Sequence, residues 1–136
     1  MGVMLQAFYW DCPQVENREH QWWIFIKSKL PLIAQAGFTA LWLPPANKAA
    51  GWKSMGYDPY DYRDLGEFDQ KGGVPAWFGS KAELLDLIES AHALELQVYA
   101  DLVVQSQQRR RCSGTKSQRR PVALDEVHAE ERQISA

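Results

Sequence analysis

The chain has 136 residues, of which 46% are hydrophobic and 24% charged, with a formal net charge of −2; this is the length of one compact domain. Residues 1–104 contain every Trp, Tyr and Phe and carry 8 Lys/Arg against 13 Asp/Glu. Residues 105–136 contain no aromatic residue and carry 7 Lys/Arg against 4 Asp/Glu. Because basic runs of this kind are most often solvated, we expect a folded part, 1–104, followed by a disordered tail, 105–136.

Composition also indicates which classes of partner the chain is expected to lack. A basic tail leaves a nucleic-acid arm as an alternative, but it has no aromatic group to stack on bases, so we expect no nucleic-acid partner. No apolar run approaches the ~20 residues of a membrane span, and no signal peptide precedes the first strand. We therefore expect no membrane partner and a cytoplasmic location. Cys12 and Cys112 lack metal-ligand spacing and are predicted to be unpaired thiols, with a disulfide as the alternative.

The first half of the folded part predicts a strand, a helix and a second strand. Residues 2–10 are apolar for most of their length, as in a strand buried on both faces. A polar loop, 14–20, precedes a helix over 21–36, where apolar residues recur at three- and four-residue steps. Pro31 predicts a kink or two abutting segments in this helix, and Gly37 predicts its end.

The second half adds one more helix and one more strand. A short apolar strand over 38–43 is followed by a loop, 46–79, whose length indicates a functional role. Ser80 and Glu83 form a capping-box pattern at the start of a helix, whose predicted apolar face is Leu84, Leu85, Ile88, Ala91 and Leu94. Residues 96–104 form the third strand. This alternation predicts an α/β fold with parallel strands, either a doubly wound sheet or a (β/α)₈ barrel.

Two features of this folded part are candidates for chemistry. The loop segment 55–66 places tyrosines between carboxylates, a mixture that suits stacking on sugar rings and hydrogen bonding to their hydroxyls. A satellite core beneath the loop is the alternative. Asp101 lies in the apolar run 98–104, where a charge is costly unless it is paired or lies at the strand end. An ion pair with a lysine or arginine is the alternative for Asp101.

Several runs, taken in order, resemble the catalytic barrel of bacterial alpha-amylases, a family of glycoside hydrolases: QAFYW (6–10), LWLPPA (41–46), GYDPYD (56–61), LGEFDQKG (65–72) and FGSKAEL (78–84). The run 98–104 looks like the start of that family's first signature, D-x-x-x-N-H. The resemblance covers residues 2–104. It implies the first three strands and two crossover helices of a (β/α)₈ barrel, and a retaining glycosidase that cleaves α-1,4-glucans such as starch and glycogen, usually with a structural calcium ion.

The same resemblance assigns roles to four residues. Tyr57 corresponds to the aromatic platform under the sugar at the cleavage point. Asp101 corresponds to the aspartate of the first signature, which helps organise the site. Gln6 and Trp10 correspond to residues that line the same subsite from the end of the first strand. All four are predicted to bind the α-glucan substrate.

The residues after Val104 depart from the family pattern. Where the signature continues with a calcium-ligating Asn and a sugar-binding His, this chain has Gln105 and Ser106. We hypothesise an out-of-frame translation, because residues 105–110 can be encoded as CAA-TCA-CAA-CAG-CGG-CGC and dropping the first base gives codons for Asn-His-Asn-Ser-Gly. A natural short protein with its own basic tail is the alternative. With the Asn replaced, we expect no metal ligand and no bound calcium in this fragment.

The family's catalytic carboxylates come from the fourth and fifth strands, with a third essential aspartate after the seventh. A retaining mechanism needs two carboxyl groups roughly 5–5.5 Å apart, so we expect no catalytic residue in this chain and no hydrolysis of starch. A related α-glucan-acting transferase, an isomaltase-like hydrolase or a non-catalytic glucan-binding fragment are the alternatives. Open barrel edges predict that the fragment self-associates.

Overall fold

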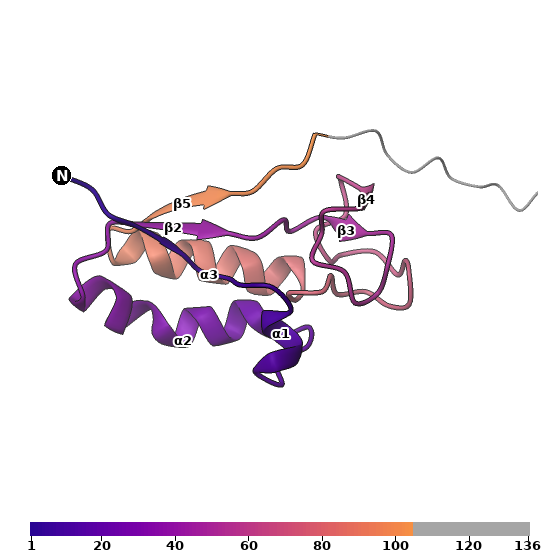
Figure 1. Cartoon of the computed structure of the whole chain (residues 1–136), viewed down its shortest axis with the longest axis horizontal. Helices are drawn as coiled ribbons and strands as arrows, with labels where there is room; N and C mark the ends of the chain where they lie inside the picture. Colours follow the sequence, from indigo (N-terminus) through magenta and orange to yellow (C-terminus); the bar gives the residue numbers. More distant parts are fainter. Residues whose placement is uncertain (105–136) are drawn as a thin grey trace, which may run out of the picture.

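In the computed structural model, the residues that can be described are 1–104 (Figure 1). The predicted disordered tail and Cys112 lie outside them. The described elements are, in chain order, β1 (Met4–Gln6), α1 (Cys12–Val15), α2 (Trp22–Gln35), β2 (Ala40–Leu43), β3 (Lys48–Ala49), β4 (Pro59–Asp61), α3 (Lys81–Ala93) and β5 (Gln97–Ala100).

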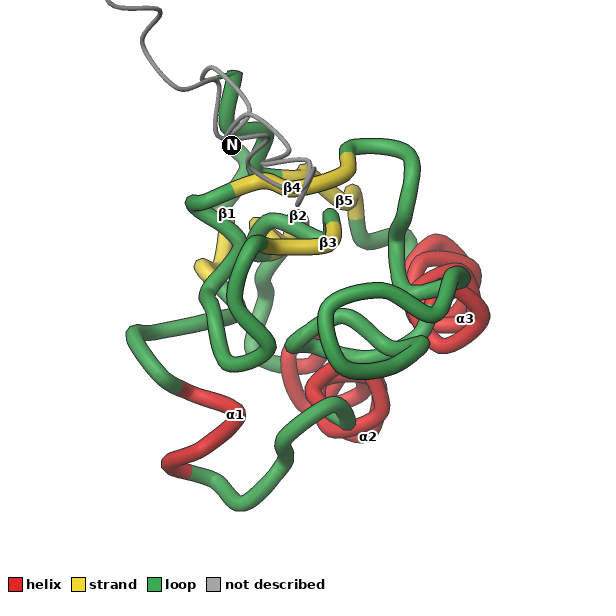
Figure 2. Tube along the Cα trace, turned by 90° about the vertical axis from the view of Figure 1, so that its right-hand side faces the viewer, coloured by secondary structure: helices red, strands yellow, loops and turns green. Residues whose placement is uncertain are grey.

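Three of these strands form a parallel sheet in the order β1-β2-β5, and the helices α2 and α3 connect them. Both helices cover the same face of the sheet (Figures 1 and 2). The short strands β3 and β4 form a separate antiparallel pair within the loop that follows β2. The structure therefore confirms the α/β alternation predicted from the sequence.

The strand register separates a covered face of the sheet from an open one. Leu5, Leu41 and Val98 are register partners on the face that the helices cover: Leu41 belongs to the hydrophobic core, and Leu5 and Val98 are partly buried against it. Their neighbours Trp42 and Tyr99, also register partners, point to the other face and are exposed. The prediction that the first strand is buried on both faces is wrong, because β1 covers only Met4–Gln6 and no described element packs on its outer face.

The helix α2 begins and ends within one residue of its predicted bounds, 21–36, and differs from the prediction at Pro31. It is a single helix that includes Pro31, so the two-segment alternative is wrong. The predicted end at Gly37 is confirmed: Gly37 has φ +92°, its N–H donates to the carbonyl of Ala34 at 3.0 Å, and the N–H of Phe38 reaches the carbonyl of Ile33 at 3.4 Å. This pattern satisfies the last carbonyls of the helix.

Upstream of α2, one helical turn overlaps the start of the predicted loop, 14–20. The turn α1 includes Pro13 near its start, where proline's missing N–H costs nothing. Cys12, at its first position, is fully buried and unpaired among the described residues. Burial raises the pKa of its thiol to about 11, so at neutral pH Cys12 is a small apolar core residue.

The capping box at the start of α3 is confirmed. The Ser80 hydroxyl accepts from the N–H of Glu83 at 3.3 Å, and the Glu83 carboxylate accepts from the N–H of Ser80 at 2.8 Å. The predicted apolar face is partly wrong: Leu84, Leu87 and Ala91 are buried, whereas Leu85 and Leu94 are exposed. At about 100° per residue, Leu85 points away from the stripe that contacts the core.

Candidate functional site

The site residues predicted from the sequence lie where the three parallel strands end. Because β1, β2 and β5 run in the same direction, the segments that follow them emerge at one edge of the sheet. Asp101 follows β5 directly, rather than lying inside a longer strand, and its N–H donates to the carbonyl of Leu43 at 3.1 Å. The carboxyl edge of a parallel sheet is where active sites of such folds are found.

A hydrogen bond joins two of the predicted residues. The Tyr57 hydroxyl donates to a carboxylate oxygen of Asp101 at 2.8 Å, across 44 residues of sequence. Burial, and then the hydrogen bond to Asp101 and its negative charge, raise the pKa of Tyr57 to about 12. No ion pair found among residues 1–104 includes Asp101. The structure therefore gives Asp101 a tyrosine partner in place of the lysine or arginine of the alternative.

The aromatic ring of Trp10 packs beside Tyr57. Trp10 and Tyr57 stack at 15° to one another with ring centroids 6.3 Å apart. Trp10 is 69% exposed and Tyr57 is 38% exposed, so both rings offer faces to solvent. They line a hollow of about 370 Å³ together with polar and charged residues, which are Asp11, Lys53, Ser54 and Asp58. Such a surface can stack on a sugar ring and hydrogen-bond its hydroxyls.

The fourth predicted residue, Gln6, is not among the residues that line this hollow. Its side-chain amide donates to the carbonyl of Phe8 at 3.0 Å, and its backbone pairs with Trp42. The structure thus brings Trp10, Tyr57 and Asp101 together and uses Gln6 locally, at the end of β1.

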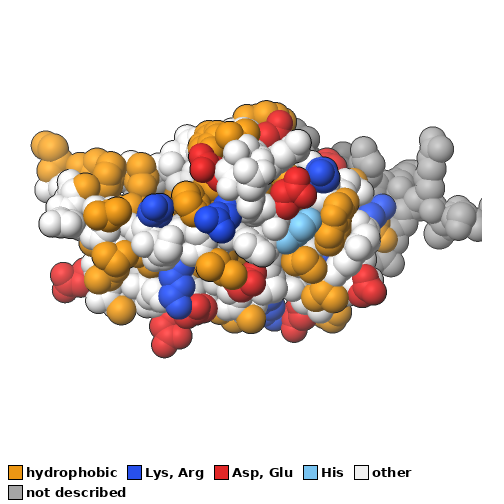
Figure 3. Space-filling model, turned by 90° about the horizontal axis from the view of Figure 1, so that it is seen from below, with side chains coloured by type: hydrophobic (Ala, Val, Ile, Leu, Met, Phe, Trp, Pro, Cys, Tyr) orange, Lys and Arg blue, Asp and Glu red, His pale blue; other side chains and the backbone are white. Residues whose placement is uncertain are grey.

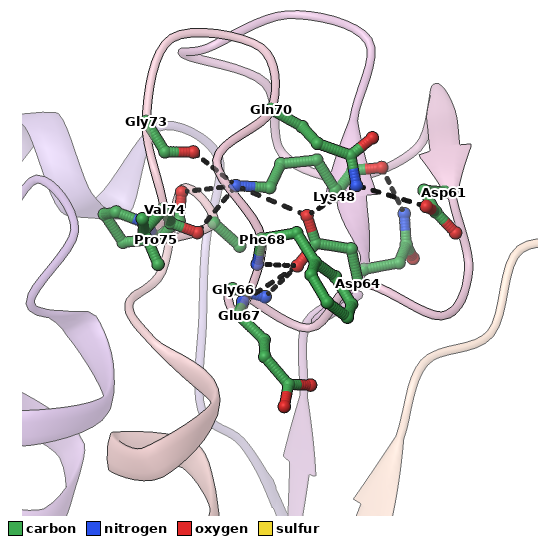
Figure 4. Close-up of polar contacts among 12 residues, drawn as sticks. Lys48, Asp61, Asp64, Gly66, Glu67, Phe68, Gln70, Gly73, Val74 and Pro75 are labelled. Atoms are coloured by element: carbon green, nitrogen blue, oxygen red, sulfur yellow. Dashed lines mark hydrogen bonds and ion pairs between the residues drawn. The ribbon is translucent and has the colours of Figure 1, made fainter.

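A buried polar cluster in the loop after β2 was missed by the sequence reasoning (Figure 4). The ammonium of Lys48 donates to three consecutive backbone carbonyls, those of Gly73, Val74 and Pro75, at 2.9, 2.7 and 3.0 Å. The carboxylate of Asp64 lies 3.6 Å from the same ammonium. Both side chains are almost fully buried, at 3% and 0% exposed. Only the pattern Asp64-x-Gly66, typical of a side chain that caps a turn, could have indicated part of it.

Among residues 1–104, no three or more His, Cys, Asp or Glu side chains gather at one point. Gln105, the position aligned with the family's calcium-ligating Asn, lies outside the described residues. That this fragment binds no calcium stays a prediction. Within the same range, the helices are too short or too polar to span a membrane.

Comparison with known proteins identifies close relatives of the chain. It is 43% identical over 102 residues to an alpha-amylase of Geobacillus stearothermophilus, which covers 75% of this chain and 18% of the relative. It is 40% identical over 103 residues to the cytoplasmic alpha-amylase of Escherichia coli (strain K12), covering 75% and 20%. The chain therefore spans about a fifth of the length of the curated relatives it matches.

Solved structures of other enzymes are also similar to this chain. Truncated alternansucrase from Leuconostoc mesenteroides matches with a TM-score of 0.55 and 25% identity, covering 66% of this chain and 9% of that one. Alternansucrase in complex with isomaltotriose matches at the same TM-score and 26% identity. A family model described as the alpha amylase catalytic domain matches residues 22–119, more than half of the sequence. The chain belongs to the alpha-amylase catalytic-domain family.

Proposed function

We propose that residues 1–104 form the first three strands of a (β/α)₈ catalytic barrel that cleaves α-1,4-glucosidic bonds in starch or glycogen. One observation carries this proposal: Trp10, Tyr57 and Asp101, which come from the segments that follow three different parallel strands, meet at the carboxyl edge of the sheet. Tyr57 is the platform on which the sugar stacks, Trp10 widens that platform, and Asp101 orients the tyrosine hydroxyl. Gln6 lines the same subsite from the end of β1 once the rest of a barrel surrounds it.

Catalysis itself requires groups that this part of the barrel does not supply. Retaining hydrolysis uses one carboxylate as nucleophile and a second carboxyl group as acid and base, roughly 5–5.5 Å apart on opposite sides of the bond. The resemblance assigns both to later strands, and the carboxylate of Asp101 is engaged by Tyr57. We expect the purified 136-residue chain to release no reducing sugar from soluble starch above a buffer control. Release above that control contradicts the proposal of an inactive fragment.

A chimera tests the sugar-binding role directly. Residues 2–104 replace the matching segment of the Geobacillus stearothermophilus alpha-amylase, to which the chain is 43% identical. We expect the chimera to hydrolyse starch and Tyr57→Ala to lower its kcat/KM by up to about tenfold, since an aromatic stack contributes at most about 1.5 kcal/mol. Phe68→Ala, which removes another exposed ring, is the control. An equal loss in both variants contradicts the role of Tyr57.

The out-of-frame origin of residues 105–136 is part of the same proposal. It is supported by the Asn-His codons that the neighbouring frame of residues 105–106 permits, and it accounts for the missing calcium ligand. Sequencing the gene decides it, because the hypothesis requires AAT-CAC or synonymous codons in that frame. The name of the Escherichia coli relative supports a cytoplasmic location, which fractionation of the source cells tests.

A glucan-acting transferase is the second candidate. The similarity to alternansucrase, one structure of which is a complex with isomaltotriose, favours it. Product analysis distinguishes the two, because a hydrolase segment leaves the chimera releasing reducing ends, whereas a transferase segment lengthens an acceptor glucan. Retardation of the 136-residue chain in amylopectin gels would instead support a non-catalytic glucan-binding fragment.

A further inference from the structure

The buried ammonium of Lys48 is surrounded by backbone carbonyl oxygens and one carboxylate. Its three N–H groups are used by the carbonyls of Gly73, Val74 and Pro75, at 2.7–3.0 Å. These distances are shorter than the 3.6 Å to Asp64, so the carbonyls solvate the charge and the carboxylate balances it. A buried charge is tolerated only when it is paired and hydrogen-bonded in this way. Lys48 therefore fixes the otherwise irregular segment 73–75 to strand β3.

Asp64 gathers a second segment around the same point (Figure 4). One of its carboxylate oxygens accepts the backbone N–H groups of three consecutive residues, Gly66, Glu67 and Phe68, at 2.9, 2.8 and 3.2 Å. Its other oxygen faces Lys48 and accepts from the Gln70 amide at 3.2 Å. Together, the two side chains join strand β3, the turn 64–68 and the segment 73–75.

The strand that carries Lys48 also holds Tyr57 in place. Strand β3 pairs with β4, and the N–H of Ala50 donates to the carbonyl of Asp58, the residue after Tyr57, at 2.8 Å. The N–H of Lys48 donates to the carbonyl of Asp64 at 2.7 Å. Tyr57 thus lies in the connection between β3 and β4, just before β4, in a hairpin whose first strand is anchored by the buried charge. Neither Lys48 nor Asp64 is among the residues that line the hollow beside Trp10 and Tyr57.

We propose that Lys48 and Asp64 are positioning residues, which act through the β3–β4 hairpin to hold the Tyr57 hydroxyl against Asp101. The value of this contact for glucan cleavage rests on the function proposed above, but the positioning itself does not. The hydrophobic core includes the loop residues Met55, Trp77 and Phe78, but neither Lys48 nor Asp64. Loss of the buried charge therefore releases the turn 64–68 and the segment 73–75, while apolar contacts keep the core in place.

Tyrosine NMR at neutral pH tests the proposal on the full 136-residue chain. The five tyrosines are labelled with ¹³C at Cζ, and Tyr57→Phe assigns the signal of interest. In Lys48→Ala we expect the Tyr57 signal to move to the position of a free phenol, whereas Tyr9 and Tyr99, outside the loop, keep theirs. Adding n-propylammonium, which replaces the lost stem and its N–H donors, restores the Tyr57 signal. Tetramethylammonium, which has no N–H donor, does not.

Matched variants separate the possible outcomes. Lys27→Ala, in an exposed pair with Asp86, leaves all five signals unchanged, and Asp64→Asn, which keeps the shape of the side chain, moves Tyr57 as Lys48→Ala does. An unchanged Tyr57 signal in Lys48→Ala overturns the proposal. So does a concerted shift of Tyr9 and Tyr99, since the pair then acts on the whole fold.

The glucan-cleaving chimera gives a second readout. There we expect Lys48→Ala to lower kcat/KM by up to ~100-fold, the cost of misplacing a positioning group. If Tyr57→Ala proves harmless in the chimera, the proposed function fails while the NMR result stands, so the two proposals fail separately.

Discussion

The long loop 46–79 and the helix layer each contain a lysine–aspartate pair, and the two pairs are built in opposite ways. In the loop, Lys48 and Asp64 are buried, lie 3.6 Å apart, and are each surrounded by backbone dipoles. On the helices, Lys27 of α2 and Asp86 of α3 are only 2.5 Å apart, yet they are 41% and 57% exposed. The surface in Figure 3 shows acidic and basic side chains interspersed with hydrophobic ones. The shorter distance belongs to the pair that water screens.

This difference shows that solvent access, rather than separation, decides what a charge pair contributes. An exposed pair exchanges water for a partner at little gain. A buried pair cannot regain water when one member is lost, so the remaining charge is left unsolvated. The loop therefore depends on Lys48, whereas the helix layer depends on its apolar core.

The largest expected effect comes from removing the buried cation. We expect Lys48→Met to lower the free energy of opening the loop by about 3–5 kcal/mol, because Asp64 and three carbonyls lose their partner inside the protein. Native-state hydrogen exchange of the loop amides measures the loss. A loss below about 1 kcal/mol would show that the loop resolvates freely and would remove the contrast between the two pairs.

A glycine substitution compares how closely atoms pack around the turn at Gly66, beside the buried pair, and around Gly37 at the end of α2. At Gly66, φ is +95° and an added Cβ meets the carbonyl oxygen of Gly79 at 2.6 Å. At Gly37, φ is +92° but nothing lies within 4 Å of that position. We expect Gly66→Ala to cost about 1–3 kcal/mol more than Gly37→Ala, since only Gly66 adds overlap to backbone strain. Equal losses of unfolding free energy in urea would refute this close packing.

Features with a local signature could be predicted from the sequence. The capping box of Ser80 and Glu83 needs two residue types three positions apart, and it forms as predicted. Gly37 marks the end of α2 by an equally local signature. Composition points to the loop segment 55–66 and to Asp101, a carboxylate in an apolar run, whereas the choice of Tyr57 comes from the resemblance to the alpha-amylase family.

Two features could not be predicted from residue types: the contacts of Lys48 with backbone carbonyls, and the exposure of the outer face of β1. Lys48 is bonded to carbonyls 25–27 residues away, and any residue type offers a carbonyl. No residue pattern marks such a partner. The strand β1 looked buried on both faces because its residues are apolar, but apolarity says nothing about whether a neighbouring element is present to cover them.

At the exposed end of the loop, the expected effects are smaller and depend on pH. The pKa of Tyr57 is raised from 10.0 to about 12, so its neutral form is stabilised by folding. This contribution is complete below about pH 10 and is lost as the pH rises from about 10 to about 12. The hydrogen bond to Glu16 raises the pKa of Tyr9 to about 12 as well, so we expect Tyr57→Phe to remove only part of the phenolate absorbance that titrates near pH 12. We expect the same variant to cost about 0.5–1 kcal/mol at neutral pH.

The variant Asp101→Asn separates the two causes of the raised Tyr57 pKa, which are burial and the contact with Asp101. It removes the negative charge but leaves the burial of Tyr57, the larger cause, so we expect the pKa of Tyr57 to fall only part of the way from about 12. Absorbance titration of the variant against Tyr57→Phe measures this. A return to an ordinary tyrosine pKa would mean that Asp101 alone carries the shift.

The smallest expected effect is at the exposed pair of the helix layer. We expect Lys27→Met to change the free energy of unfolding by less than about 0.5 kcal/mol, because water solvates Asp86 as soon as the lysine is gone. A double-mutant cycle with Asp86→Asn isolates the coupling between the two side chains, since each single variant also removes a charge from the surface. Coupling as large as the loss in Lys48→Met would mean that the 2.5 Å separation outweighs exposure, and the contrast between loop and helix layer would then have to rest on something other than solvent access.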